Sequence, residues 1–205
     1  MPADALWYLA RGSGVTALVL LTVVVVLGIV TRSRGTLGAV TGRSRLVVTS
    51  VHRSAALAAV VFLVIHLVTL LFDPYAELKL VDLVVPFTST YRPLFVGLGA
   101  LALDLVLALV VTSLLRDRLG LRAWRAVHLA AYALWPIALV HGIGAGSDAA
   151  APWLIGIDIA CVVAVLAALA THPALTGSTT DRARRRAPQQ SAPPLAGAGA
   201  REATR

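Results

Sequence analysis

The chain has 205 residues, of which 58% are hydrophobic and 14% are charged, and its formal net charge is +8. Its mean hydropathy is +0.83, and its apolar share exceeds the roughly 45–50% that is usual in soluble proteins. A single core cannot bury that much apolar surface, so the composition excludes an ordinary soluble domain and predicts an all-α integral membrane protein. The basic residues lie between and after apolar segments instead of on one soluble face, so we expect no nucleic-acid partner.

Five apolar segments have the ~17–25 residues that a membrane-spanning helix requires. The first is predicted to be a retained helix and not a signal peptide, because only Arg11 precedes it and the stop-transfer-like TRSRG follows it. The segments form a predicted bundle of five transmembrane helices over residues 14–172, after a short outer segment at residues 1–13. In chain order they cover about residues 14–30, 46–72, 95–115, 124–143 and 153–170.

Basic residues predict the orientation of the bundle. The loops on one side of the bundle contain only two basic residues, Lys79 and Arg92. By the positive-inside rule, the N-terminus is therefore outside and the C-terminus inside. Residues 173–205 are expected to be a disordered basic cytoplasmic tail, either solvated or in contact with anionic lipid. The inner side is predicted to carry Arg32, Arg34, Arg43, Arg45, Arg116, Arg118, Arg122, Arg182, Arg184, Arg185, Arg186, Arg201 and Arg205.

Four histidines lie at two depths of two spans that run in the same direction. His52 and His128 lie near the inner ends, while His66 and His141 lie near the outer ends, about 20 Å away at 1.5 Å per residue. Intramembrane histidines can relay protons, hold structure or line an ion path. Imidazole is also an axial ligand of haem iron, and helix bundles build cofactor sites between facing helices. The pattern favours two b haems, with a proton- or metal-coupled transporter as the alternative.

The two histidines of the second span lie nearly on one face of the helix, whereas the two histidines of the fourth span do not. Fourteen residues bring His66 to within about 40° of His52 around an ideal helix. Thirteen residues leave His141 about 140° from His128. Pro136 lies between the latter two, and we expect a kink at this proline to bring His141 back toward the face of His128.

The spacings H-x13-H and H-x12-H, with DPY, PFTSTYRP and RAWRAVHLAAYALWPIALVHG, resemble the ferric reductase-like transmembrane domain. Ferric reductases, NADPH oxidases and the haem-binding membrane subunit of bacterial periplasmic methionine sulfoxide reductase systems share this domain. The resemblance covers about residues 5–171. It implies an inner haem b held by His52 and His128, and an outer haem b held by His66 and His141. The family usually has six helices with ligands on the third and fifth, whereas here they fall on the second and fourth of five.

The resemblance implies a b-type cytochrome that passes electrons across the membrane, as the electron-transfer subunit of an oxidoreductase. The sequence carries no flavin or nicotinamide domain, so we expect a separate donor, either a flavin reductase or a quinol. The expected acceptor is an outer redox protein, ferric iron or oxygen. The expected location is the cell membrane, as a multi-pass protein of a bacterial inner membrane surrounded by lipid.

Charged and aromatic residues near the two levels are candidate haem contacts. Arg53 and Arg125 could pair with inner propionates, or could act only as topogenic charges. Tyr91 and Arg92 are the outer candidates. They end a loop, residues 73–92, whose half-apolar segment could cover the bundle as a lid.

Two aromatic residues in the fourth span have expected roles between or beside the macrocycles. Trp135 lies between His128 and His141 along the chain, opposite the small Ala59. It is expected between the two haems, as a bridge or spacer, with ordinary packing as the alternative. Tyr132, one turn after His128, is expected to form part of the cofactor wall.

Several polar residues and glycines in the spans have no single predicted role. Asp104 and Asp158 could orient a ligand imidazole, relay protons or be protonated and hydrogen-bonded. His172 lies near the end of the last span without a partner at its depth, so an interfacial position is favoured over ligation. Gly97 and Gly99 are expected to allow close approach of helices.

Overall fold

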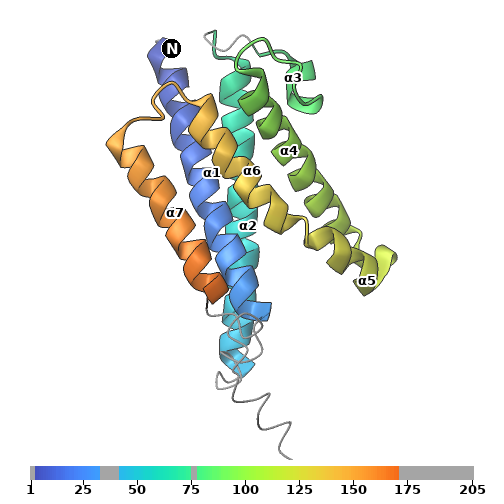
Figure 1. Ribbon diagram of the computed structural model, residues 1–205. Coiled ribbons are helices and arrows are strands. Elements are labelled where there is room, and N and C mark those ends of the chain that lie inside the picture. The colour runs from blue at the N-terminus through green and yellow to red at the C-terminus, as the bar shows by residue number, and fades with distance from the viewer. Residues whose placement is uncertain (1–2, 33–41, 75–77, 171–205) are drawn as a thin grey trace, which may run out of the picture.

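The computed structural model describes residues 3–32, 42–74 and 78–170, and all regular secondary structure in these ranges is helical (Figure 1). The predicted tail and His172 lie outside the described residues. The helices are α1 (Ala3–Arg32), α2 (Gly42–Leu71), α3 (Leu80–Val84), α4 (Pro93–Leu114), α5 (Arg116–His128), α6 (Ala131–Ala145) and α7 (Pro152–Ala170).

Four of these helices are long and apolar enough to cross a membrane. α5 and α6 meet at a bend of 45° and would make a fifth crossing if they form one broken span. Residues 3–13 of the expected outer segment form the first turns of α1. Large apolar side chains such as Leu57, Val61 and Val64 on α2 are exposed, as lipid-facing positions require. The four unbroken spans are Ala5–Thr31, Leu46–Leu71, Pro93–Leu114 and Pro152–Ala170. The chain is thus a helical multi-pass membrane protein.

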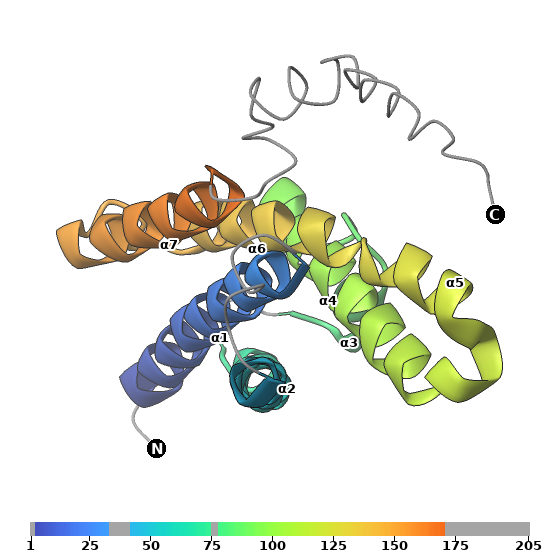
Figure 2. The same ribbon diagram turned by 90° about the horizontal axis from the view of Figure 1, so that it is seen from below.

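The helices pack around α1 and around α4, and α6 contacts both of them. α1 lies along α2 and also contacts α6 and α7, while α4 packs against α6, α5 and the short α3. Figure 2 shows α2 end-on beside α1, with α4 and α6 across from this pair. We call the end of the bundle at which α3 lies the α3 end, and the opposite end the α5 end (Figure 1). α2 and α6 both run from the α5 end toward the α3 end.

The fourth span breaks at Leu129 and Ala130, which lie between α5 and α6. Bonds to the third preceding residue tighten the chain here, from the Ala130 N–H to Val127 and from the Tyr132 N–H to Leu129. Pro136 lies inside α6. The bend therefore lies six residues before Pro136, the position at which the sequence predicts a kink. It leaves His128 as the last residue of one helix and His141 on the next.

The apolar core lies between α1, α6 and α7. Ile29 on α1 is only 2% exposed, and its neighbours come from all three helices. This packing holds α6 and α7 against α1. The cluster consists of Leu18, Val25, Ile29, Trp135, Leu139, Cys161, Val165 and Ala168.

Candidate functional site

A cavity of about 1480 Å³ lies inside the bundle, and all four predicted ligand histidines line it. Pockets for single small ligands are usually about 300–1,000 Å³, so this one has room for more than one. Leu78, Asp82 and Leu83 line it from the loop that the sequence analysis expected as a lid. The Asp82 carboxylate accepts hydrogen bonds from the Lys79 N–H and the Thr88 hydroxyl, which hold that loop in a fixed turn.

His66 on α2 and His141 on α6 meet at the α3 end of the cavity. Their ring centroids are 6.4 Å apart and their planes are inclined at 78°. A metal–imidazole bond of about 2 Å on each side of one iron would place the two ring centres on the order of 6 Å apart. The separation of this pair therefore fits ligation of one iron from opposite sides.

His52 on α2 and His128 at the end of α5 lie at the α5 end of the cavity, close enough to interact electrostatically. The His128 ring is stacked on Trp124, with centroids 4.8 Å apart and planes at 27°. Its Nδ1 is buried and has no hydrogen-bond partner among the described residues. A buried imidazole nitrogen with no partner costs free energy, so this end of the cavity has unused capacity to bind a polar group or metal.

The other three histidines each bond through Nδ1 to a main-chain carbonyl. The acceptors are Ala10 for His66 at 2.8 Å, Val24 for His52 at 3.1 Å and Phe95 for His141 at 2.7 Å. A carbonyl only accepts, so each bonded Nδ1 must carry the proton, and Nε2 of the neutral ring keeps its lone pair. Metal-ligating histidines usually hold their second nitrogen in this way. The residues present therefore fit two bis-imidazole haems.

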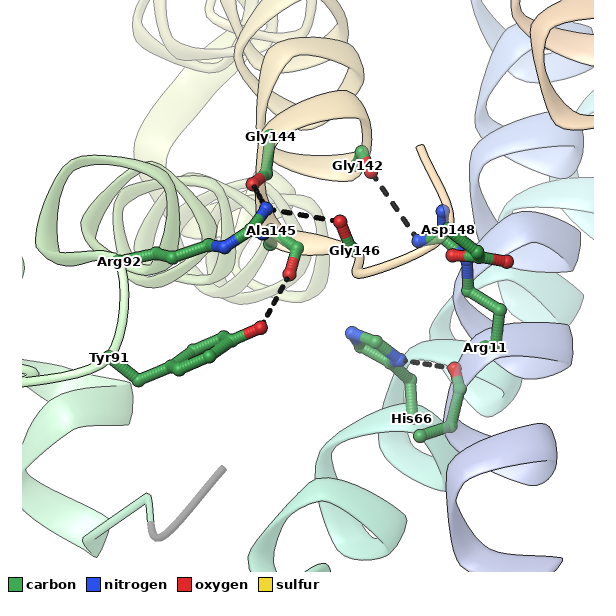
Figure 3. A network of polar contacts seen from close by, with 10 residues as sticks. Arg11, His66, Tyr91, Arg92, Gly142, Gly144, Ala145, Gly146 and Asp148 are labelled. Carbon is green, nitrogen blue, oxygen red and sulfur yellow. Dashed lines mark hydrogen bonds and ion pairs between the residues drawn. The ribbon is translucent and has the colours of Figure 1, made fainter. Parts of the chain in front are cut away.

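Four of the predicted contact residues also line the cavity. Arg53 and Arg125 lie at its α5 end and are exposed, so both guanidinium groups can reach a ligand there. Tyr132 forms part of the wall, as expected. Tyr91 lines the α3 end, where its hydroxyl donates to the Ala145 carbonyl at 3.4 Å (Figure 3).

Arg92 lies outside the cavity lining and instead binds the end of α6. Its guanidinium donates to the carbonyls of Gly144 at 2.6 Å and Gly146 at 3.0 Å (Figure 3). These bonds satisfy carbonyls that the helix end leaves open, and they hold the Arg92 backbone at φ 40 just before α4. Its contacts are those of a structural clamp between α4 and α6.

Trp135 also lies elsewhere than expected. Its indole is 9% exposed and belongs to the core cluster between α1, α6 and α7, and its Nε1–H donates to the Thr22 hydroxyl at 2.9 Å. Trp135 does not line the cavity, whereas Ala59 does. The structure thus favours packing, the alternative to a position between the macrocycles.

Sequence reasoning missed Arg11, which it used only to judge the first span. Arg11 lines the α3 end of the cavity, pairs with Asp148 at 2.8 Å and donates to the Gly142 carbonyl at 3.4 Å (Figure 3). It also interacts electrostatically with His66 and His141. The only feature of the sequence that could have indicated a role for Arg11 is its position directly before the first apolar span.

The aspartates of the spans differ in position. Asp158 lines the cavity and lies near enough to Arg11 to interact electrostatically, whereas Asp104 is half-buried on α4 outside the lining. Within residues 3–32, 42–74 and 78–170, no three His, Cys, Asp or Glu side chains form a cluster that could hold a metal ion. The histidines come together as pairs.

A family model described as ferric reductase like transmembrane component matches residues 13–139. The match covers α1 to the middle of α6 and includes His52, His66 and His128, and it ends two residues before His141. Neither a curated protein nor a solved structure matches the chain. The family model spans more than half of the 205 residues and confirms the resemblance seen in the histidine spacing: this chain belongs to the ferric reductase-like transmembrane family.

Proposed function

We propose that this chain is a transmembrane b-type cytochrome, in which His52 and His128 hold one haem and His66 and His141 hold a second. Membership of the family indicates electron transfer across a membrane. The observation that carries the proposal is the bonding of the ring nitrogens, because His52, His66 and His141 each use Nδ1 on a carbonyl and keep Nε2 for a metal.

The chain would contribute ligation, spacing and insulation. A bound haem supplies a one-electron couple between ferric and ferrous iron. The 14-residue step from His52 to His66 separates the two levels by about 21 Å along α2. Apolar side chains such as Leu21, Val60 and Leu103 line the cavity and would exclude water from the space between the levels.

The cations at the two ends would bind haem propionates. Arg53 and Arg125 line the α5 end, where arginine can form charge-assisted bonds with a carboxylate. At the α3 end the corresponding cation is Arg11, which is paired with Asp148, and Tyr91 offers a hydroxyl. Each haem would thus be held by two histidines and by nearby cations.

We propose that the α5 end faces the cytoplasm, because the arginines of the loops cluster there, and that the membrane is a bacterial inner membrane. Electrons would enter at the level of His52 and His128 and leave at the level of His66 and His141. The donor is proposed to be a separate flavin reductase or a quinol. The acceptor is proposed to be an outer redox protein, ferric iron or oxygen.

Electron transfer across a sealed vesicle tests this function. Purified protein is reconstituted into liposomes that contain ferricyanide, and dithionite is added outside. We expect the trapped ferricyanide to be reduced much faster than in protein-free liposomes, and His66→Ala vesicles to lose this gain. Reduction no faster than in protein-free liposomes, by wild-type protein of verified incorporation, would refute the proposal.

A further inference from the structure

Each carbonyl that accepts a histidine Nδ1 lies four residues before a glycine on the same helix. This relation holds at all three bonded histidines, on α1 for two of them and on α4 for the third. The carbonyl and glycine pairs are Ala10 and Gly14, Val24 and Gly28, and Phe95 and Gly99.

Helix geometry explains how a glycine at this position exposes the carbonyl. The Cα–Cβ bond leans toward the helix N-terminus, so a side chain covers the turn before its own Cα. The carbonyl of residue i already accepts the N–H of residue i+4 and has one further lone pair. A side chain at i+4 stands over that lone pair, whereas a glycine leaves it open to a neighbouring helix.

The three glycines differ in the space that a side chain would find beside them. A methyl group on Gly99 would lie 2.5 Å from Cε1 of His141, and one on Gly14 would lie 2.9 Å from Cε1 of His66. Carbon atoms in favourable contact are about 3.5–4.0 Å apart, so both rings would have to move. A methyl group on Gly28 would lie 3.7 Å from Cε1 of His52, which is an ordinary contact.

His128 differs from the other three histidines in this respect. Within the part of the chain that the structure describes, its Nδ1 has no hydrogen-bond partner, and its ring is stacked on Trp124. A glycine thus accompanies the carbonyl bond at each of the three bonded histidines.

We propose that Gly14, Gly28 and Gly99 are positioning residues, each of which admits one histidine ring to the carbonyl of the preceding turn. The bond fixes the tautomer with the proton on Nδ1 and aims Nε2 into the cavity. The consequence for haem rests on the proposed function, whereas the tautomer is a property of the chain itself.

Alanine variants test the proposal through haem binding at each level. Gly14→Ala and Gly99→Ala are expected to weaken haem binding at the α3 end by about 10–100-fold, the usual effect of losing the partner of a metal-ligating histidine. Gly28→Ala is expected to cause a smaller loss, at the α5 end only. Haem that remains should have a raised midpoint potential, because an imidazole without its carbonyl bond is a weaker donor. Haem content and potentiometric titration measure both effects.

Gly12 and Gly156 provide matched controls, because a methyl group on either meets nothing within 4 Å. Alanine is the better helix former, so Gly12→Ala and Gly156→Ala should keep both haems at wild-type potentials. The proposal is overturned if Gly14→Ala and Gly99→Ala behave like these controls, or if the controls lose as much haem.

The histidine tautomers give a second readout that does not depend on haem. Haem-free wild-type protein labelled with ¹⁵N-histidine is expected to show His52, His66 and His141 protonated on Nδ1. Protonation of these rings on Nε2 would overturn the proposal. A wild type that binds no haem would refute the cytochrome, and comparison of the tautomers of the wild type with those of Gly14→Ala and Gly99→Ala would still decide the role of the glycines.

Discussion

Replacing His66 by alanine is expected to remove one haem and spare the other. His66 and His141 face each other at 6.4 Å between ring centroids, so they would serve the same iron. His52 lies about 21 Å away along α2, well beyond the 7–10 Å within which substitutions usually interact. The haem content should therefore fall from two per chain to one, and His141→Ala should give the same value.

Double variants sharpen this prediction, because the pairing decides their outcome. His66→Ala combined with His141→Ala should still hold one haem, whereas His66→Ala combined with His52→Ala should hold none. The pyridine haemochrome assay measures haem per chain, and His172→Ala serves as the histidine control that should retain both. One haem in the second double variant, or none in the first, would refute the pairing.

Three further predictions concern the core, the outer charges and the orientation. Trp135→Ala should keep both haems and a nearly unchanged rate of electron transfer between them, but it should cost about 3–5 kcal/mol of stability; a clear fall in rate would place the ring on the electron path. Arg11→Gln should lower the midpoint potential of the α3-end haem, and Asp148→Asn should raise it, because a positive charge favours the ferrous state. Each shift is expected to be tens of millivolts, which is less than the roughly 59 mV that corresponds to a tenfold change in a one-electron equilibrium. A redox titration in which either variant shifts the potential in the other direction would contradict the role of the pair. A reporter active only in the cytoplasm should work within residues 33–41 and stay silent within residues 75–77; the reverse result would invert the bundle.

The sequence predicts those features that depend on local patterns. Apolar runs of spanning length identify α1, α2, α4 and α7, because a membrane requires long uninterrupted apolar helices. Depth follows from residue count alone, since every helical residue rises about 1.5 Å. His52 and His66 on the unbroken α2 therefore lie at opposite ends of the cavity, as expected.

The features that depend on tertiary packing could not be predicted in this way. The break at Leu129 and Ala130 lies before the kink expected at Pro136, and neither residue is of a helix-breaking type. The direction in which Trp135 points depends on which side of α6 faces α1, and the sequence does not contain that rotation. Arg11 meets Asp148 across 137 positions of the chain, so only the fold shows that the two residues are partners.

The measurement that tests the central claim most directly is the haem content of the purified wild-type chain. The account predicts a reduced spectrum with the α-band of b haem and two haems per chain in the pyridine haemochrome assay. It also predicts two low-spin ferric signals in electron paramagnetic resonance, one for each histidine pair. Folded protein that contains no haem, or whose haem is high-spin with only one histidine ligand, would contradict the account.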